Sequence, residues 1–382
     1  MSIHIFKYSK IPFLLALFCS LAGFTSIDSN YRNNIIGKQK KEIKIGFLYS
    51  NMSDSSALHA AELAIEEVNK QGGGNGTYFK LVAYSVEGAW GIGSKKSVKM
   101  VFEDKVWAIV GSLDGRNAHL AEQVATKTHI TFLSTWATDP TLSQAFVPWY
   151  FRCIFNDNQQ AETLVTEIYK KDKQKKIAII SNKSYDASMS SKSLINEVVA
   201  KGNLTPEVFT IENDSPDHIK RILSNITKSQ IKTVVLLVAS GYSNSIIGFA
   251  ADQNLAIQFY CDIASYDHSI IKLPNSIEII VISPNYWFTE TGKSFQYEFK
   301  KKYGYCPGAK AAFSYDGINL ILEAICKAGL DHEKIKSTLS SISYEISVTG
   351  KINFDKMGNR IDNPSLVKIE DVNQLLIIKD YE

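Results

Sequence analysis

The sequence predicts an α/β protein built from two similar lobes, each organised around a parallel sheet. From residue 42 onward, short runs rich in β-branched and aromatic residues alternate with longer runs of helical periodicity. Strands separated by helices of this length form βαβ units, because each connection must return to the same edge of the sheet. The alternation falls into two series of comparable size. A chain of 382 residues is too long for one ordinary core and suits two domains.

The N-terminus is typical of an export signal. Lys7 and Lys10 precede an apolar stretch over residues 11–24, which is shorter than a membrane span. Small residues at the end of this stretch fit cleavage after Ala22. We therefore expect a signal peptide over residues 1–22.

Residues 23–41 are polar and aperiodic, which predicts a flexible tether. Cys19 leaves open a lipoprotein, and the apolar stretch leaves open an uncleaved anchor as the one membrane attachment. In each case the folded part of the protein is expected to be periplasmic or otherwise extracytoplasmic.

The first series covers residues 42–134. Its first helix carries an apolar stripe from Leu58 to Val68 and stops at the glycines 72–74. The predicted strands are 42–50, 78–85, 106–112 and 130–134, and the predicted helices are 57–74, 94–104 and 118–128.

The second series covers residues 161–283 and repeats the same alternation, which predicts a second lobe rather than one large sheet. Its predicted strands are 176–181, 207–211, 232–239, 257–262 and 276–283, and its predicted helices are 161–171, 188–201, 217–229 and 243–253. The remaining chain changes character, with predicted helices at 294–303, 309–328 and 332–340 followed by strand-like runs at 350–355 and 373–380.

Charge and cysteine content narrow the class of protein. The 42 basic and 39 acidic residues leave a net charge of +3, and the basic run 170–176 is typical of a solvated helix end, so no nucleic-acid partner is expected. Four cysteines follow the signal peptide, at wide spacings that resemble no zinc site. Disulfides and four buried free thiols both remain open for Cys153, Cys261, Cys306 and Cys326.

Motifs for catalysis or for cofactor binding fail on inspection. The glycine-rich run 88–97 lacks the lysine of a phosphate loop, and no dinucleotide fingerprint or Gly-x-Ser-x-Gly elbow is present. His119 and His129 bracket one helix outside any metal or triad motif, and Asp262 and Asp267 are an ordinary pair of loop acids. We therefore expect no enzymatic activity, no metal and no cofactor.

The turns that lead from strands into helices are the strongest candidate site. Open α/β sheets bind ligands at the carboxyl ends of their parallel strands, where helix N-termini offer N–H groups to an anion-like oxygen. Trp90, Trp136 and Tyr185 are expected to wall the cavity. The four candidate turns are 50–56, 111–117, 134–143 and 181–189.

These residues resemble the type I periplasmic solute-binding proteins of ABC transporters, in the branch that binds leucine-type amino acids or amides. The resemblance covers residues 43 to about 370. It rests on the combination of "IKIGFLYS", "AAELAIEEVNKQGG", "VWAIVGS", "AEQVATKTHITFLSTWATDPTLS", "YFRCIFNDNQQAETL", "KIAIISNKSYDAS", "AAFSYDGINLILEAICKAG" and "VTGKINFDKMGNR".

The resemblance implies two Rossmann-like lobes joined by three crossovers, with the ligand cleft between them and closure by a hinge motion. The crossovers are expected near Phe155–Asp157, Ser283–Asn285 and Ser340–Gly350. Lobe one is then expected over 42–155 plus 286–339, and lobe two over 156–285 plus 340–382.

The resemblance also implies that the loop "SLDGRN", with Asp114, Gly115 and Arg116, gives donors to the solute's carboxylate. The family often has a serine where Gly115 stands, so only a backbone N–H is left there. Arg116 is a candidate replacement for the lost donor. This departure favours an anionic or extended solute over plain leucine.

The remaining implied site residues lie on both lobes. The segment Trp136, Ala137 and Thr138 matches the family's grip on ammonium and carboxylate through a carbonyl and a hydroxyl, and Tyr185 matches a cleft aromatic. The family's acid for the ammonium aligns with Ile263, so its place falls to the neighbouring Asp262, a second departure from the pattern. Tyr242, at a strand end, is a weaker candidate.

The sequence therefore predicts a solute receptor that captures a small polar molecule, an amino acid, an amide or a related carboxylate, and delivers it to the membrane permease of an ABC transporter. A sensory module using the same cleft is the alternative, disfavoured because this chain shows no appended output domain. An extracytoplasmic hydrolase of a small amide is a distant third, for want of a nucleophile and base pair.

Overall fold

The computed structural model describes residues 42–51, 55–74, 76–89, 91–144, 147–266, 277–371 and 374–378. The predicted signal peptide and tether, Trp90 and Asp267 lie outside the described residues. Within the described ranges, no helix combines the length and the apolar character that crossing a membrane requires.

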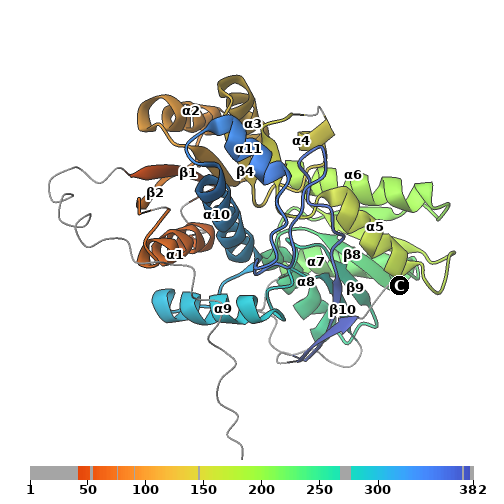
Figure 1. Cartoon of the computed structure of the whole chain (residues 1–382). Helices are drawn as coiled ribbons and strands as arrows, with labels where there is room; N and C mark the ends of the chain where they lie inside the picture. The colour runs from red at the N-terminus through yellow and green to blue at the C-terminus, as the bar shows by residue number, and fades with distance from the viewer. Residues whose placement is uncertain are drawn as a thin grey trace, which may run out of the picture. The chain divides into compact units, whose positions relative to one another are not determined.

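The first sheet is parallel throughout, as the βαβ pattern predicts (Figure 1). In spatial order it contains β2 (Phe79–Ser85), β1 (Ile43–Tyr49), β3 (Ala108–Ser112), β4 (Thr131–Ser134) and β5 (Tyr150–Arg152). The strand β5 is only three residues long, too short to give an alternation signal in the sequence.

The second sheet is parallel in its centre and gains two antiparallel strands from the C-terminal tail. In spatial order it contains β12 (Gln374–Ile378), β11 (Leu366–Asp371), β10 (Glu278–Ile282), β9 (Gln258–Cys261), β8 (Thr233–Leu237), β6 (Ile177–Ser181) and β7 (Glu207–Thr210). The expected strand at 350–355 is wrong, since that segment forms only isolated bridges.

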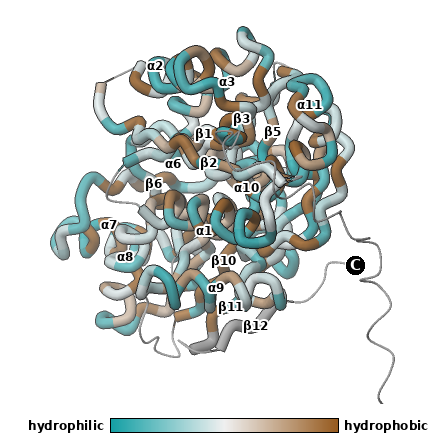
Figure 2. Tube along the Cα trace, turned by 60° about the vertical axis from the view of Figure 1, so that its left-hand side comes forward, coloured by the Kyte–Doolittle hydropathy of each residue, from teal (hydrophilic) through white to brown (hydrophobic). Residues whose placement is uncertain are grey.

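Helices flank both sheets, and in Figure 2 teal and brown segments alternate along several of the coils, as expected of amphipathic helices. With the first sheet belong α1 (Ser56–Lys70), α2 (Ile92–Lys99), α3 (Gly115–Thr128), α4 (Thr141–Gln144), α9 (Glu290–Tyr303), α10 (Ala309–Ala328) and α11 (His332–Ser340). With the second belong α5 (Asp157–Ile168), α6 (Tyr185–Ala200), α7 (Pro216–Lys228) and α8 (Ser240–Asp252). A π-helical turn, Met100–Asp104, ends α2.

The long helix α10 is part of the core of lobe one and positions the segment after β4. It packs on α1 and against β3 and β4. Gly317 of α10 lies so close to the side chain of Thr135 that a β-carbon would have no room there. Because Thr135 follows β4 directly, this close approach places the segment that continues from β4 into the cleft.

The chain passes between the two sheets three times, as the resemblance implies: after β5, after β10 and after α11. The third passage rests on lobe one, because Asn359 forms a bridge with Arg152 of β5 and Phe354 packs edge-on against Phe151. The lobe boundaries 42–155 plus 286–339 and 156–285 plus 340–382 remain our proposal.

The four cysteines that the structure describes are unpaired. Cys153 and Cys261 are buried, whereas Cys306 and Cys326 are exposed, so the expectation of four buried thiols is right for two of them. Burial raises the pKa of the Cys153 and Cys261 thiols, which makes both of them poor nucleophiles.

Candidate functional site

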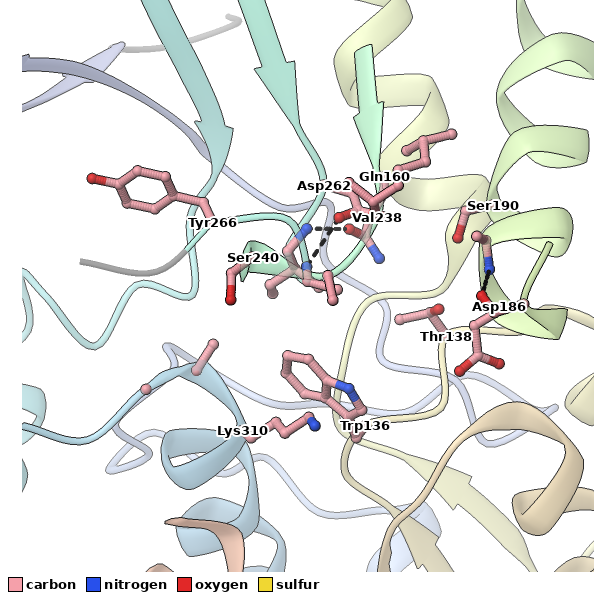
Figure 3. A pocket seen from close by; sticks show the side chains of 18 of the residues that line it. Trp136, Thr138, Gln160, Asp186, Ser190, Val238, Ser240, Asp262, Tyr266 and Lys310 are labelled. Atoms are coloured by element: carbon pink, nitrogen blue, oxygen red, sulfur yellow. Dashed lines mark hydrogen bonds between the residues drawn. The ribbon is translucent and has the colours of Figure 1, made fainter. Parts of the chain in front are cut away.

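A cavity of about 550 Å³ lies at the carboxyl ends of β4, β6, β8 and β9, between the two sheets (Figure 3). Its walls come from both lobes and are mostly small, hydroxyl-bearing or apolar groups around a few charges. Lobe one contributes Ser56, Trp136, Thr138, Gly308, Ala309 and Lys310. Lobe two contributes Gln160, Asn182, Ser184, Asp186, Ala187, Ser190, Leu237, Val238, Ala239, Ser240, Asp262, Ile263, Ala264 and Tyr266.

The segment after β4 is held in place by a buried arginine. Arg152 of β5 is fully buried and donates to the carbonyl oxygens of Ala137, at 3.3 Å, and Asp139, at 2.7 Å. The carbonyl of Thr138 accepts from the N–H of Asp157 at 2.9 Å, which ties the same segment to the start of α5. Trp136 and Thr138 are therefore presented to the cavity by a rigid support.

Trp136 and Lys310 form the lobe-one wall of the cavity. Figure 3 shows the indole facing the lobe-two residues, with the lysine side chain beside it. The ammonium of Lys310 lies 5.3 Å from the centre of the indole ring, within the range of a cation–π contact. Lys310 stands in the first turn of α10, so this helix directs its N-terminal end at the cavity.

Asp262 is anchored where β9 ends. Its carboxylate accepts from the hydroxyl of Ser265 at 2.6 Å and from the N–H of Ala264 at 3.1 Å. The next residue, Ile263, donates its N–H to the side-chain oxygen of Gln160 at 3.0 Å. Burial raises the pKa of Asp262 to about 6, although these hydrogen bonds and those of the Ser265 backbone lower it.

Two further carboxylates lie close to Asp262. Burial raises the pKa of Asp157 to about 7 and that of Asp186 to about 6. The charge of Asp262 further raises the pKa of Asp157, and the charge of Asp186 further raises that of Asp262. Asp157 accepts from the hydroxyl of Ser190 at 2.9 Å, directly behind the cavity wall. A positive charge in the cavity would relieve this repulsion and keep all three acids ionised.

At the N-terminus of α3, the N–H groups of Gly115 and Asn117 already have acceptors within the protein. Asp114 caps its own helix, since its carboxylate accepts from the N–H and the side-chain amide of Asn117. The N–H of Gly115 donates to a carboxylate oxygen of Asp186, on the other lobe, at 2.9 Å. The anion held by this helix N-terminus is therefore a side chain of the protein itself.

A second contact between the lobes lies beside the first. Tyr185 donates its hydroxyl to Asp139 at 2.6 Å, and Asp139 also faces His119 at 3.1 Å and accepts from Thr141. Burial alone would raise the pKa of the Asp139 carboxyl. The hydrogen bonds outweigh burial and hold this pKa well below its usual range. The hydrogen bonds to Asp139 and then to Glu122 raise the pKa of His119 to about 9, so this network is charged near neutral pH.

The site residues predicted from the sequence lie in different places in the structure. Trp136, Thr138 and Asp262 line the cavity, whereas Asp114, Arg116 and Tyr185 line a separate hollow of about 410 Å³. In that hollow the Arg116 guanidinium lies 5.2 Å from the centre of the Tyr185 ring, so the geometry does not support Arg116 as a donor to a solute in the main cavity. Gly115 and Ala137 are buried, Tyr242 packs on the core of lobe two, and Trp90 is outside the described residues.

Sequence reasoning missed Lys310, Gln160, Ser190 and Asp186 as cavity residues. Asp186 had a signal, because it follows Tyr185 inside a candidate strand-to-helix turn. Lys310, Gln160 and Ser190 lie on α10, α5 and α6, whose apolar patterns do not indicate which polar residues face the cavity. Among the described residues, no group of His, Cys, Asp and Glu is arranged to hold a metal ion.

Residues 42–368 match the family model described as periplasmic binding protein. The Leu/Ile/Val-binding protein homolog 7 of Brucella abortus is 25% identical, over 81% of this chain and 83% of its own length.

Solved structures share the fold at lower identity. The substrate binding protein of a branched-chain amino acid transporter from Streptococcus pneumoniae, in complex with isoleucine, has a TM-score of 0.74 at 21% identity, over 89% of this chain and all of that one. A solute binding protein of an ABC transporter from R. palustris, in complex with benzoate, has a TM-score of 0.75 at 16% identity, over 88% and 96% of the two chains. The same fold thus holds solutes as different as an aliphatic amino acid and an aromatic acid.

Proposed function

Because the chain belongs to the family of periplasmic binding proteins, we propose that it captures one small polar solute in this cleft and delivers it to the permease of an ABC transporter. The family consists of substrate-binding proteins, and the chain is a solute receptor of this kind. We also propose that residues 1–22 direct export of the chain and that the permease of an ABC transporter is its partner.

The observation that supports it best is the cavity itself. It measures about 550 Å³, within the range of small-molecule sites, and both lobes contribute polar groups to it. Trp136 offers an apolar face, and Thr138, Ser190 and Asp262 offer hydrogen-bonding groups around it. A solute bound there touches both lobes, so its contacts favour the closed arrangement.

Binding without reaction fits the chemistry of the described lining residues. Their hydroxyl groups, those of Ser56, Thr138, Ser184, Ser190 and Ser240, have no histidine beside them within the described lining to act as a base. We therefore propose that the solute leaves the cleft unchanged.

The experiment is a thermal-shift screen of the purified chain without residues 1–41, against amino acids, amides, amines and small carboxylates. A ligand that binds only the native state raises the unfolding midpoint by an amount that grows with the logarithm of its concentration over Kd. The Thr138→Val and Asp262→Asn variants should lose the shift caused by the best solute while keeping the midpoint of the ligand-free fold. Full retention of the shift in both variants would place the solute elsewhere, and turnover of a hit would favour the hydrolase.

A further inference from the structure

Asp186 lies at the boundary between the main cavity and the N-terminus of α3. It lines both the cavity of about 550 Å³ and the neighbouring hollow of about 410 Å³. Figure 3 shows it close to Thr138 and Ser190, on the lobe-two side of the cleft. One of its carboxylate oxygens accepts from Gly115 of lobe one at 2.9 Å.

This bond decides what the N-terminus of α3 can do. A helix N-terminus stabilises an anion through its free N–H groups and its dipole. Here Asp114 already satisfies Asn117, and Asp186 satisfies Gly115. A β-carbon on Gly115 would lie 3.0 Å from the Asp186 oxygen and 2.9 Å from the Tyr185 ring, so the glycine leaves just enough room for this internal carboxylate.

The charge balance around the cavity points the same way. The charged side chains among its described lining residues are Asp186, Asp262 and Lys310, and Asp157 lies directly behind the wall next to Ser190. Two carboxylates and one ammonium therefore line the described wall, and Asp157, on which the charge of the buried Arg152 also acts, adds a third acid behind it. The surplus negative charge attracts a cationic group and repels a second carboxylate.

From these contacts we infer that Asp186 is a specificity-determining residue: it fills the anion site at α3 with the protein's own carboxylate, and with Asp262 it selects a solute that carries an ammonium group but no carboxylate on the adjacent carbon. The chemical class is a primary amine, with Trp136 packing on its apolar part. This inference rests on the proposed receptor function and narrows its solute.

The test compares matched probes on the same carbon skeleton. Leucine, 3-methylbutylamine and 4-methylpentanoate form one set, and phenylalanine, 2-phenylethylamine and 3-phenylpropanoate form another. In thermal-shift and calorimetric titrations of the wild-type chain, the amine of a set should bind more tightly than its amino acid by about tenfold or more, the worth of one charge-assisted bond, and the carboxylate should bind least. Tighter binding of the amino acids or carboxylates would overturn the inference while leaving the receptor function intact.

Two variants separate the effect of the Asp186 charge from the effect of its occupying the N-terminus of α3. Asp186→Asn keeps an oxygen for the N–H of Gly115 but removes the charge, so it should weaken amine binding by about tenfold without gaining carboxylate binding. Asp186→Ala frees the N–H, so it alone should gain binding of the carboxylate probes. If Asp186→Ala gains none, the helix N-terminus is not the site that Asp186 occupies.

A further experiment does not depend on the carbon skeleton of the solute. Sodium formate at high concentration, compared with sodium chloride of equal ionic strength, should raise the unfolding midpoint of Asp186→Ala and not that of the wild type or of Asp186→Asn. An equal effect of formate on all three would overturn the inference. Failure of the whole solute panel on the wild type, with formate rescue retained, would refute the receptor function and keep the assignment of Asp186.

Discussion

Gly115→Ala tests whether the closeness of the two lobes depends on the missing side chain. The added β-carbon would lie 2.9 Å from the Tyr185 ring, 3.0 Å from the Asp186 carboxylate and 3.2 Å from the β-carbon of Asp139. The first two neighbours are side-chain atoms, but each belongs to a group that is held by a hydrogen bond between the lobes. The start of α6 must therefore move away from α3, and both bonds are put at risk.

The expected magnitude follows from those two bonds. Each joins a donor to a charged carboxylate, and such bonds contribute about 1.5–3 kcal/mol apiece. Loss of one of them weakens closure by at least the ~1.4 kcal/mol that corresponds to a factor of ten in affinity, and loss of both gives about a hundredfold or more.

The assay is the solute Kd from calorimetry, together with the radius of gyration in solution without solute. Gly248→Ala is the matched control, since Gly248 lies on the exposed side of α8 and an added β-carbon there meets nothing within 4 Å. Gly115→Ala should bind more weakly than this control and scatter as a more open particle. Equal affinity and equal radius in the two variants would refute the steric reasoning.

Three further outcomes follow from the same contacts. Because the pKa values of Asp186 and Asp262 are raised to about 6, an amine should bind less tightly as the pH falls through that value, measured by calorimetry at pH 7.5 and 5.0. His119 has a raised pKa of about 9, so its contribution to stability is complete below pH 6.5 and is lost as the pH rises through 9; His119→Gln should abolish that part of the pH dependence in urea unfolding. Arg152→Met leaves several buried oxygens without their donor and should cost about 3 kcal/mol or more in urea unfolding, whereas the exposed Arg221→Met should cost less than about 0.5 kcal/mol.

Much of the fold follows from local patterns in the sequence. The two βα series, their parallel order and the turns at strand ends all depend on residues that are neighbours in the chain. Trp136 and Thr138 were predictable for that reason, since they directly follow the buried strand β4. The short β5 and the tail strand β11 were missed because their pairing depends on partners elsewhere in the chain.

The site depends on contacts that no local pattern contains. Gly115 and Asp186 are 71 positions apart and belong to different lobes, so neither residue indicates the other in the sequence. Tyr242, by contrast, was predicted to face the cleft and does not line the cavity. Its place after β8 suggested the cleft, but it falls inside α8, which turns the ring onto the core of lobe two. Side-chain direction within the first helical turn decides both outcomes, and it is set by packing rather than by sequence position.

The bond between Gly115 and Asp186 links solute choice to lobe closure. A solute carboxylate can reach the N–H of Gly115 only by displacing Asp186, and that displacement breaks one of the two hydrogen bonds described here between α6 and lobe one. An α-amino acid bound in that way therefore forfeits about 1.5–3 kcal/mol of closure, and the displaced Asp186 remains in a cavity that Asp262 already makes acidic. An amine incurs neither cost, since its ammonium lowers the repulsion between the same two carboxylates. The preference against an α-carboxylate thus follows from the closed arrangement as a whole, in addition to the direct repulsion by the acidic lining of the cavity.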